Sequence, residues 1–138
     1  MLKILQSTLI TALFCSTLYA GDIHIHIVGI DEDRGTIMVE LFSTSQKESF
    51  PIPREAIEKR VKANKHGVDV VYKDIPAGEY AISTIHDKNS NGTMDRYFIG
   101  IPKEPYGNSG EYTLFKPNFE DSKFALSLED INLTIKLH

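Results

Sequence analysis

Residues 23–28 have the sequence IHIHIV, which places three isoleucines on one face and His24 and His26 on the other. This period of two is typical of a β-strand with one buried face. Residues 36–42 alternate in the same way, with Ile37, Val39 and Leu41 on the apolar face. Because the polar, glycine-containing segment 31–35 between them suits a turn, the two segments are expected to form an antiparallel hairpin.

Further strands are expected along the rest of the chain. Residues 68–75 and 80–85 flank the turn-forming sequence Pro76-Ala77-Gly78-Glu79, which predicts a second hairpin. Residues 124–128 and 131–137 are two more candidate strands. Between these pairs, residues 87–110 are dense in Gly, Asn, Pro and Ser, and within them only residues 97–101 are expected to pair briefly.

Residues 53–64 are expected to form one short surface helix. Pro53 suits a first helical position, and Ala56, Ile57 and Val61 fall on one side of a helix. Glutamates and lysines lie four residues apart, at 55/59 and 58/62, where they would support a helix.

About seven short strands and one short helix predict an all-β domain, an antiparallel sandwich of immunoglobulin-like or transthyretin-like type. Residues 74–82, DIPAGEYAI, resemble a turn common in transthyretin-like modules. A chain of this length supports one hydrophobic core, so residues 21–138 are expected to form a single domain.

Residues 1–20 have the features of a cleavable signal peptide. Lys3 supplies a positive charge, an apolar run extends from Leu9 to Leu18, and a cleavage site is expected near Ala20. Bulky Phe14 before Cys15 argues against lipoprotein processing, so no stable membrane anchor is expected. The mature protein is therefore expected in the periplasm or outside the cell.

Removal of residues 1–20 leaves 14 basic and 19 acidic residues, a net charge of −5. This balance argues against nucleic acid and anionic membrane surfaces as partners. The single cysteine, Cys15, leaves with the signal peptide, so no disulfide is available to the mature chain.

The sequence DKNSNGTMD, residues 87–95, resembles the first two-thirds of an EF-hand calcium loop. Oxygen donors recur at alternate positions, and Gly92 at the sixth position permits a sharp turn. The expected ligands are Asp87, Asn89, Asn91, the backbone carbonyl of Thr93, and Asp95.

The twelfth position of this loop holds Phe98 instead of a bidentate glutamate. Further donors would have to be water or Glu104, Glu111 or Asp121, which the sequence does not rank. With two charged ligands in the loop, a structural Ca²⁺ site of weak affinity is expected, with a Kd on the order of 10⁻⁴ to 10⁻³ M. The alternative is a turn in which the Asn and Asp side chains only cap their own backbone.

A closer resemblance extends over nearly the whole mature chain. Residues 80–95, then GIPKEPYGNS at 100–109 and PNFEDS at 117–122, resemble a signature of exported bacterial proteins, "YA-hDeNgNGklD…fGiPkEpyGfS…p-FedA". That family is known only as a domain of unknown function. The resemblance implies an exported β-sandwich and no particular reaction. Asn108 and Ser122 depart from the signature, which has an aromatic and a small apolar residue there.

Several other residues were considered as reactive groups. His24 and His26 could chelate Zn²⁺ or Cu²⁺ but are more simply polar residues on a strand. His86 could act as a general base, although packing is the simpler role, and the context of Ser109 lacks a nucleophile elbow.

Two hypotheses follow. The favoured one is a non-enzymatic exported module, stabilised by calcium, that binds an envelope protein or a glycan. The alternative is a small periplasmic hydrolase whose active site is the polar loop from His86 to Asp121.

Overall fold

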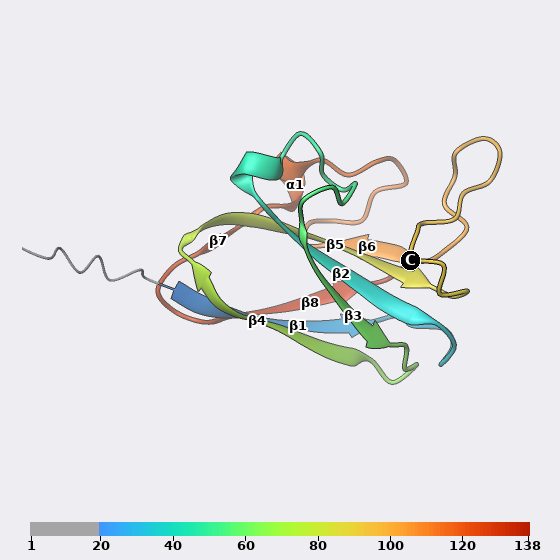
Figure 1. Ribbon diagram of the computed structural model, residues 1–138, viewed down its shortest axis with the longest axis horizontal. Coiled ribbons are helices and arrows are strands. Elements are labelled where there is room, and N and C mark those ends of the chain that lie inside the picture. The colour runs from blue at the N-terminus through green and yellow to red at the C-terminus, as the bar shows by residue number, and fades with distance from the viewer. Residues whose placement is uncertain (1–19) are drawn as a thin grey trace, which may run out of the picture.

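The computed structural model describes residues 20–138 as a two-layered β-structure (Figure 1). Its strands are β1 (Ala20–Val28), β2 (Thr36–Ser43), β3 (Ile57–Lys62), β4 (Val68–Pro76), β5 (Gly78–Asp87), β6 (Tyr106–Asn108), β7 (Phe124–Leu126) and β8 (Ile131–Lys136). A single 3₁₀ turn spans Thr44–Gln46, and one short helix, α1, spans Phe119–Ser122. The expected all-β sandwich is confirmed.

The eight strands form two sheets. The smaller has the order β4-β1-β8 and the larger the order β3-β2-β5-β6, with β7 also pairing with β5. Strands of one layer cross those of the other at an angle (Figure 1), and the apolar faces of β1 and β2 pack into one core. All ladders are antiparallel except that of β1 with β8, which is parallel.

Both predicted hairpins are wrong, because each connection passes from one sheet to the other. β1 pairs with β4 and β8, whereas β2 pairs with β3 and β5. β4 and β5 are separated only by Ala77 but also belong to different sheets. Since both strands of each pair have a strong apolar face, placing them on opposite sides of the core buries both faces against each other.

The helix predicted over residues 53–64 is also wrong, since residues 57–62 form strand β3 at the edge of the larger sheet. The same residues carry a period of two, with Val61 packed against the core and Arg60 on the opposite face. In the ladder with β2, six consecutive residues of β3 each lie opposite a residue of β2. The tertiary need of β2 for a neighbour therefore overrides the helical spacing of the charges.

Tyr72 ties the two layers together. Its ring is buried in the core, and its hydroxyl oxygen lies 2.8 Å from the carbonyl oxygen of Val39 and 3.0 Å from that of Ile57. Burial raises the pKa of this hydroxyl, which keeps it protonated as a donor.

The outer face of the larger sheet is covered near the C-terminal end of β2. Phe42 points to this face, and its ring lies 5.0 Å from that of Phe50, which in turn lies 6.2 Å from Phe119 of α1. The side-chain oxygen of Asn118 accepts a hydrogen bond from the Asp121 N–H and caps α1. Two segments without sheet pairing therefore form a small second core with β2 and β5.

The predicted signal peptide lies outside the described residues apart from Ala20, which begins β1 and pairs with Pro76. Among residues 20–138, the helices are too short to cross a bilayer.

Candidate functional site

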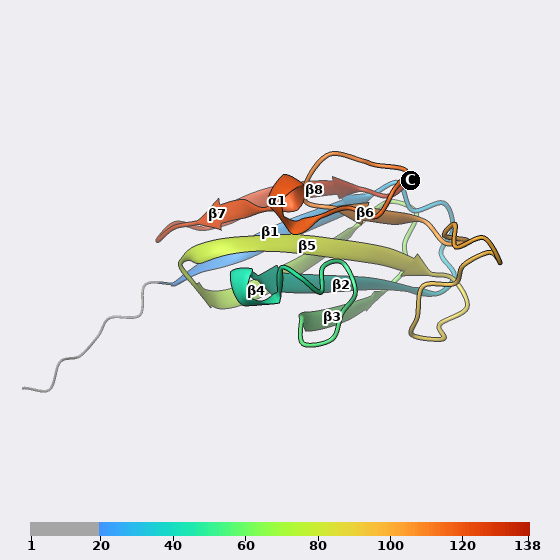
Figure 2. The same ribbon diagram turned by 90° about the horizontal axis from the view of Figure 1, so that it is seen from above.

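The loop that was predicted to bind calcium leaves the end of β5 and lies between β5 and β6. Figure 2 shows this connection projecting from the end of the sandwich at which the chain also ends. Asp87, the first expected ligand, is the last residue of β5 and is buried. Gly92 has a φ of 80°, a backbone conformation that glycine adopts without strain, as its place in a sharp turn requires.

The loop is wound around the carboxylate of Asp87. One oxygen of that carboxylate accepts the N–H of Asn91 at 3.1 Å, and the other accepts the N–H of Gly92 at 2.7 Å. The Asn89 side-chain oxygen also accepts the Asn91 N–H, and that of Asn91 accepts the Thr93 N–H. These are the Asx turns of the alternative interpretation, and they use the side-chain oxygens of Asn89 and Asn91 that a metal would need.

Asp95 closes the loop on its far side. Its two carboxylate oxygens accept hydrogen bonds from the side-chain amides of Asn89, at 2.6 Å, and Asn91, at 2.9 Å. Four of the five expected ligands therefore contact one another directly. Thr93 lies next to them, since its hydroxyl is 3.2 Å from the Asn91 side-chain oxygen.

Glu104 brings a third carboxylate to the loop. One of its oxygens accepts the N–H of Lys88 at 2.9 Å and the other accepts the N–H of Asp95 at 3.0 Å, so that this buried side chain joins the two ends of the loop. Glu111 is exposed, and Asp121 bonds to Asn118 at α1. Of the three additional donors considered from the sequence, Glu104 is thus the one that lies at the loop.

The residue types at the loop suit a hard cation such as Ca²⁺, although the acidic ligand atoms do not all lie within 4.8 Å of one another. Asp87, Asp95 and Glu104 supply carboxylate oxygens, Asn89 and Asn91 supply amide oxygens, and each of these oxygens has a further lone pair. Ligation by the two asparagines requires their amides, which now donate to Asp95, to turn their oxygens inward. Phe98, at the twelfth position, is fully exposed and offers no ligand.

A cationic side chain lies next to the loop. A Cβ atom at Gly92 would be 3.4 Å from the guanidinium of Arg60 on β3. The hydrogen bond from this guanidinium to Glu58 raises its pKa, and Asp87 contributes further to the shift. Arg60 therefore partly neutralises the negative charge that would attract a cation.

A surface groove of about 330 Å³ adjoins the loop. The groove has apolar and charged walls, formed by Lys88, Ile101, Pro102, Lys103, Glu104, Pro105, Tyr106, Tyr112, Leu114 and His138. Next to it, two loop tips expose large apolar side chains, namely Tyr97, Phe98 and Ile99 in one and Leu114 and Phe115 in the other. Exposed apolar side chains gathered beside a groove are typical of interaction surfaces.

Sequence reasoning missed this surface. The segment Tyr97–Ile101 was expected to pair briefly, and it does so only with itself, through the Tyr97 N–H and the Ile101 carbonyl at 2.8 Å. The available signal was the run of apolar residues without alternation in this segment. In a polar loop, such residues have no core against which to pack, so the run indicates an exposed apolar surface.

The groups proposed for a hydrolase do not converge. The His86 ring is buried, with one nitrogen 2.7 Å from the Arg34 carbonyl oxygen and the other 3.4 Å from an Asp31 oxygen. Glu104 lines the groove, whereas His86 and Asp121 do not. The three groups therefore do not share one cleft, while the loop 87–95 itself borders a groove.

Ser109 has a structural role. Its hydroxyl donates to the Ser122 carbonyl at 2.5 Å and accepts the Ile82 N–H at 2.8 Å. It thereby joins β5 to the last residue of α1.

Comparison with known proteins gives a family and no function. Residues 25–134 match the sequence profile of a family described as "Uncharacterized protein conserved in bacteria (DUF2141)". Neither a curated protein nor a solved structure matches the chain.

Proposed function

Since the chain belongs to this family of uncharacterized bacterial proteins, DUF2141, we propose that it acts as an exported, non-enzymatic binding module with a Ca²⁺ site in the loop 87–95. The observation that carries the proposal is that backbone N–H groups of the loop 87–95 bond to the carboxylates of Asp87 and Glu104, while the carboxylate of Asp95 accepts the loop's asparagine amides. Three acidic side chains held at one short loop favour a divalent cation.

The metal would act as a structural clip. It would hold the exposed connection between β5 and β6 in one conformation, and thereby fix the groove that shares Lys88 and Glu104 with the loop. Ordering a binding surface before the partner arrives lowers the entropic cost of association.

The partner would bind at the groove and the two apolar loop tips. Ile99, Ile101 and Leu114 expose aliphatic side chains, which favour a protein surface over a sugar, whereas Phe98 and Tyr112 could stack on either. Of the two partner classes considered, the groove therefore favours an envelope protein over a glycan.

Thermal unfolding of the purified, untagged protein tests the calcium site. A ligand that binds only the native state raises the unfolding midpoint, so millimolar Ca²⁺ should raise it above the value in chelator by about 5 °C, and Mg²⁺ should raise it less. The variant Asp95→Asn, which keeps an oxygen acceptor in place, should lose most of this increase.

Glu111→Gln is the matched control, because Glu111 is an exposed acid away from the loop. It should retain the full response to Ca²⁺. An unchanged midpoint at several millimolar Ca²⁺, or an equal increase in Asp95→Asn and the wild type, would contradict the calcium site.

A further inference from the structure

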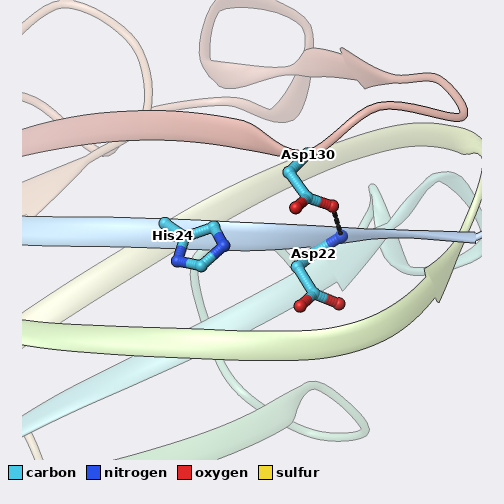
Figure 3. Close-up of side chains that lie close together, drawn as sticks. All are labelled: Asp22, His24 and Asp130. Atoms are coloured by element: carbon cyan, nitrogen blue, oxygen red, sulfur yellow. Dashed lines mark hydrogen bonds between the residues drawn. The ribbon is translucent and has the colours of Figure 1, made fainter.

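A second cluster of metal-ligating side chains lies on the outer face of the smaller sheet, on strands that the calcium loop does not contact. Asp22 and His24 lie on β1, and Asp130 immediately precedes β8 (Figure 3). Each residue offers one ligand atom, and these three atoms lie within 4.8 Å of one another. The side chains come together because β1 and β8 run parallel, with Ile23 opposite Ile131.

The backbone fixes this arrangement. Gly21 allows the turn before β8 to approach closely, since a Cβ atom there would lie 2.8 Å from the Glu129 carbonyl oxygen. The Asp22 N–H donates to an Asp130 carboxylate oxygen at 2.8 Å, the dashed line in Figure 3. The ladder of β1 and β4 is irregular at the same point, between Gly21 and Ile23. Irregularities of this kind re-aim a side chain out of the regular alternation.

We propose that Asp22, His24 and Asp130 form a site for a divalent transition metal, with Zn²⁺ as the best match. One imidazole nitrogen and two carboxylate oxygens are ligands that Zn²⁺ accepts, and the cluster's position at the surface leaves a fourth place for water. Ca²⁺ would be a poorer match, because it prefers oxygen ligands in larger number.

Two hydrogen-bond donors flank the carboxylate of Asp22. One of its oxygens accepts the Asp74 N–H at 2.9 Å, and the other lies 3.0 Å from the Lys73 ammonium. These two hydrogen bonds, the backbone one first, lower the pKa of Asp22. Asp74 has a φ of 54°, so its N–H is directed at Asp22 by a backbone conformation uncommon for a side-chain-bearing residue.

Lys73 would compete with the metal. Its ammonium is paired with the same carboxylate, and most of its side chain is exposed, so it can move into solvent when a cation binds. Substitution of Lys73 should therefore have the opposite effect to substitution of a ligand. Loss of the Lys73 ammonium should strengthen metal binding, whereas loss of a ligand should weaken it.

Isothermal titration calorimetry tests the proposal by measuring Zn²⁺ binding to the purified, untagged protein at pH 7.5. Ca²⁺ is present to occupy the loop 87–95. His24→Gln and Asp130→Asn should each weaken binding at least about tenfold, the effect expected from losing one of three ligands. Both keep a polar group of similar size, and Asp130→Asn keeps an acceptor for the Asp22 N–H. Lys73→Met should tighten binding severalfold.

His66→Gln is the matched control, since His66 is an exposed histidine outside the cluster. It should bind Zn²⁺ as the wild type does. The NMR signals of the His24 imidazole should also shift on addition of Zn²⁺. No Zn²⁺ binding at one millimolar metal, or equal binding by the wild type, His24→Gln and Asp130→Asn, would overturn the proposal, whatever the result for Ca²⁺ at loop 87–95.

Discussion

The outer faces of the two sheets both carry polar residues on a central strand but differ in environment. On the smaller sheet, the outward residues of β1 include His24 and His26, and His26 forms a 2.8 Å contact with Asp69 of β4 in solvent. On the larger sheet, the outward face of β2 carries Glu40, which is fully buried, and its two carboxylate oxygens have no hydrogen-bond partner among the described residues.

The difference lies in what covers each face. Beside Glu40, the aromatic cluster of Phe42, Phe50 and Phe119 seals the larger sheet. The described residues place no second aromatic cluster of this kind on the smaller sheet. A polar residue at an alternating position of a strand is thus exposed or buried according to segments distant in the sequence.

The largest effect on stability is expected for a variant that removes part of the aromatic cluster on the larger sheet. Phe119→Ala deletes a buried ring that packs against Phe50, and it should lower the free energy of unfolding by about 3–5 kcal/mol. Urea denaturation measures this change. Phe115→Ala, which removes an exposed ring from the neighbouring loop, should change stability little. Equal effects of the two variants would mean that α1 does not seal the sheet.

Glu40→Gln tests the burial of the carboxyl group. Burial, and secondarily the charge of Glu58, raise the pKa of Glu40 to about 8. The folded state therefore keeps a proton that the unfolded chain loses above its ordinary pKa of 4.5. The contribution of Glu40 to the free energy of unfolding is fully present below pH 4.5. It is lost as the pH rises to 8, at up to about 1.4 kcal/mol per pH unit.

The neutral glutamine should remove this loss. Urea denaturation of Glu40→Gln should match the wild type at pH 5 and show a free energy of unfolding about 2–4 kcal/mol higher at pH 9. Glu55→Gln, on an exposed residue, should reproduce the wild-type profile at both values. A parallel pH dependence in Glu40→Gln and the wild type would show that the carboxyl group is hydrated.

The smallest effect is expected on the exposed face, for Asp22→Asn in the presence of chelator. The pKa of Asp22 is lowered, so its contribution to stability is present at neutral pH and is lost as pH falls below the ordinary value of 3.8. The midpoint of thermal unfolding of Asp22→Asn should lie slightly below that of the wild type at pH 7. The midpoints of Asp22→Asn and the wild type should converge near pH 2. A difference that persists at pH 2 would assign the effect to packing instead of charge.

The sequence predicted the strands better than their partners. Alternation of apolar and polar residues identified β1, β2 and β8, although β2 is buried on both faces, but alternation carries no information on which strands pair. Both supposed hairpins failed for this reason. Residues 57–62 satisfied a helical and a strand pattern at once, and only the free edge of β2 decides between them.

The candidate sites also differ in whether a local sequence signal reveals them. The loop 87–95 could be recognised as a candidate because its expected ligands lie within nine residues and their spacing is specific. The place of Glu104 beside it, and the meeting of Asp130 with Asp22, depend on tertiary structure across 9 and 108 residues and have no local signal. The burial of Glu40 also has no local signal, and Phe42, two residues along the same strand, packs against the distant Phe50.

The parallel pairing of β1 with β8 has a consequence for the order of folding. β1 is the middle strand of its sheet, so it requires a neighbour on each side, and one of these neighbours is the last strand of the chain. A chain that emerges from a ribosome or a translocation pore with its N-terminus first cannot complete this sheet until its final residues have appeared. Contacts over such separations also slow folding. β1 therefore stays without one of its two neighbours until β8 has emerged, so the smaller sheet is among the last parts of the fold to be completed.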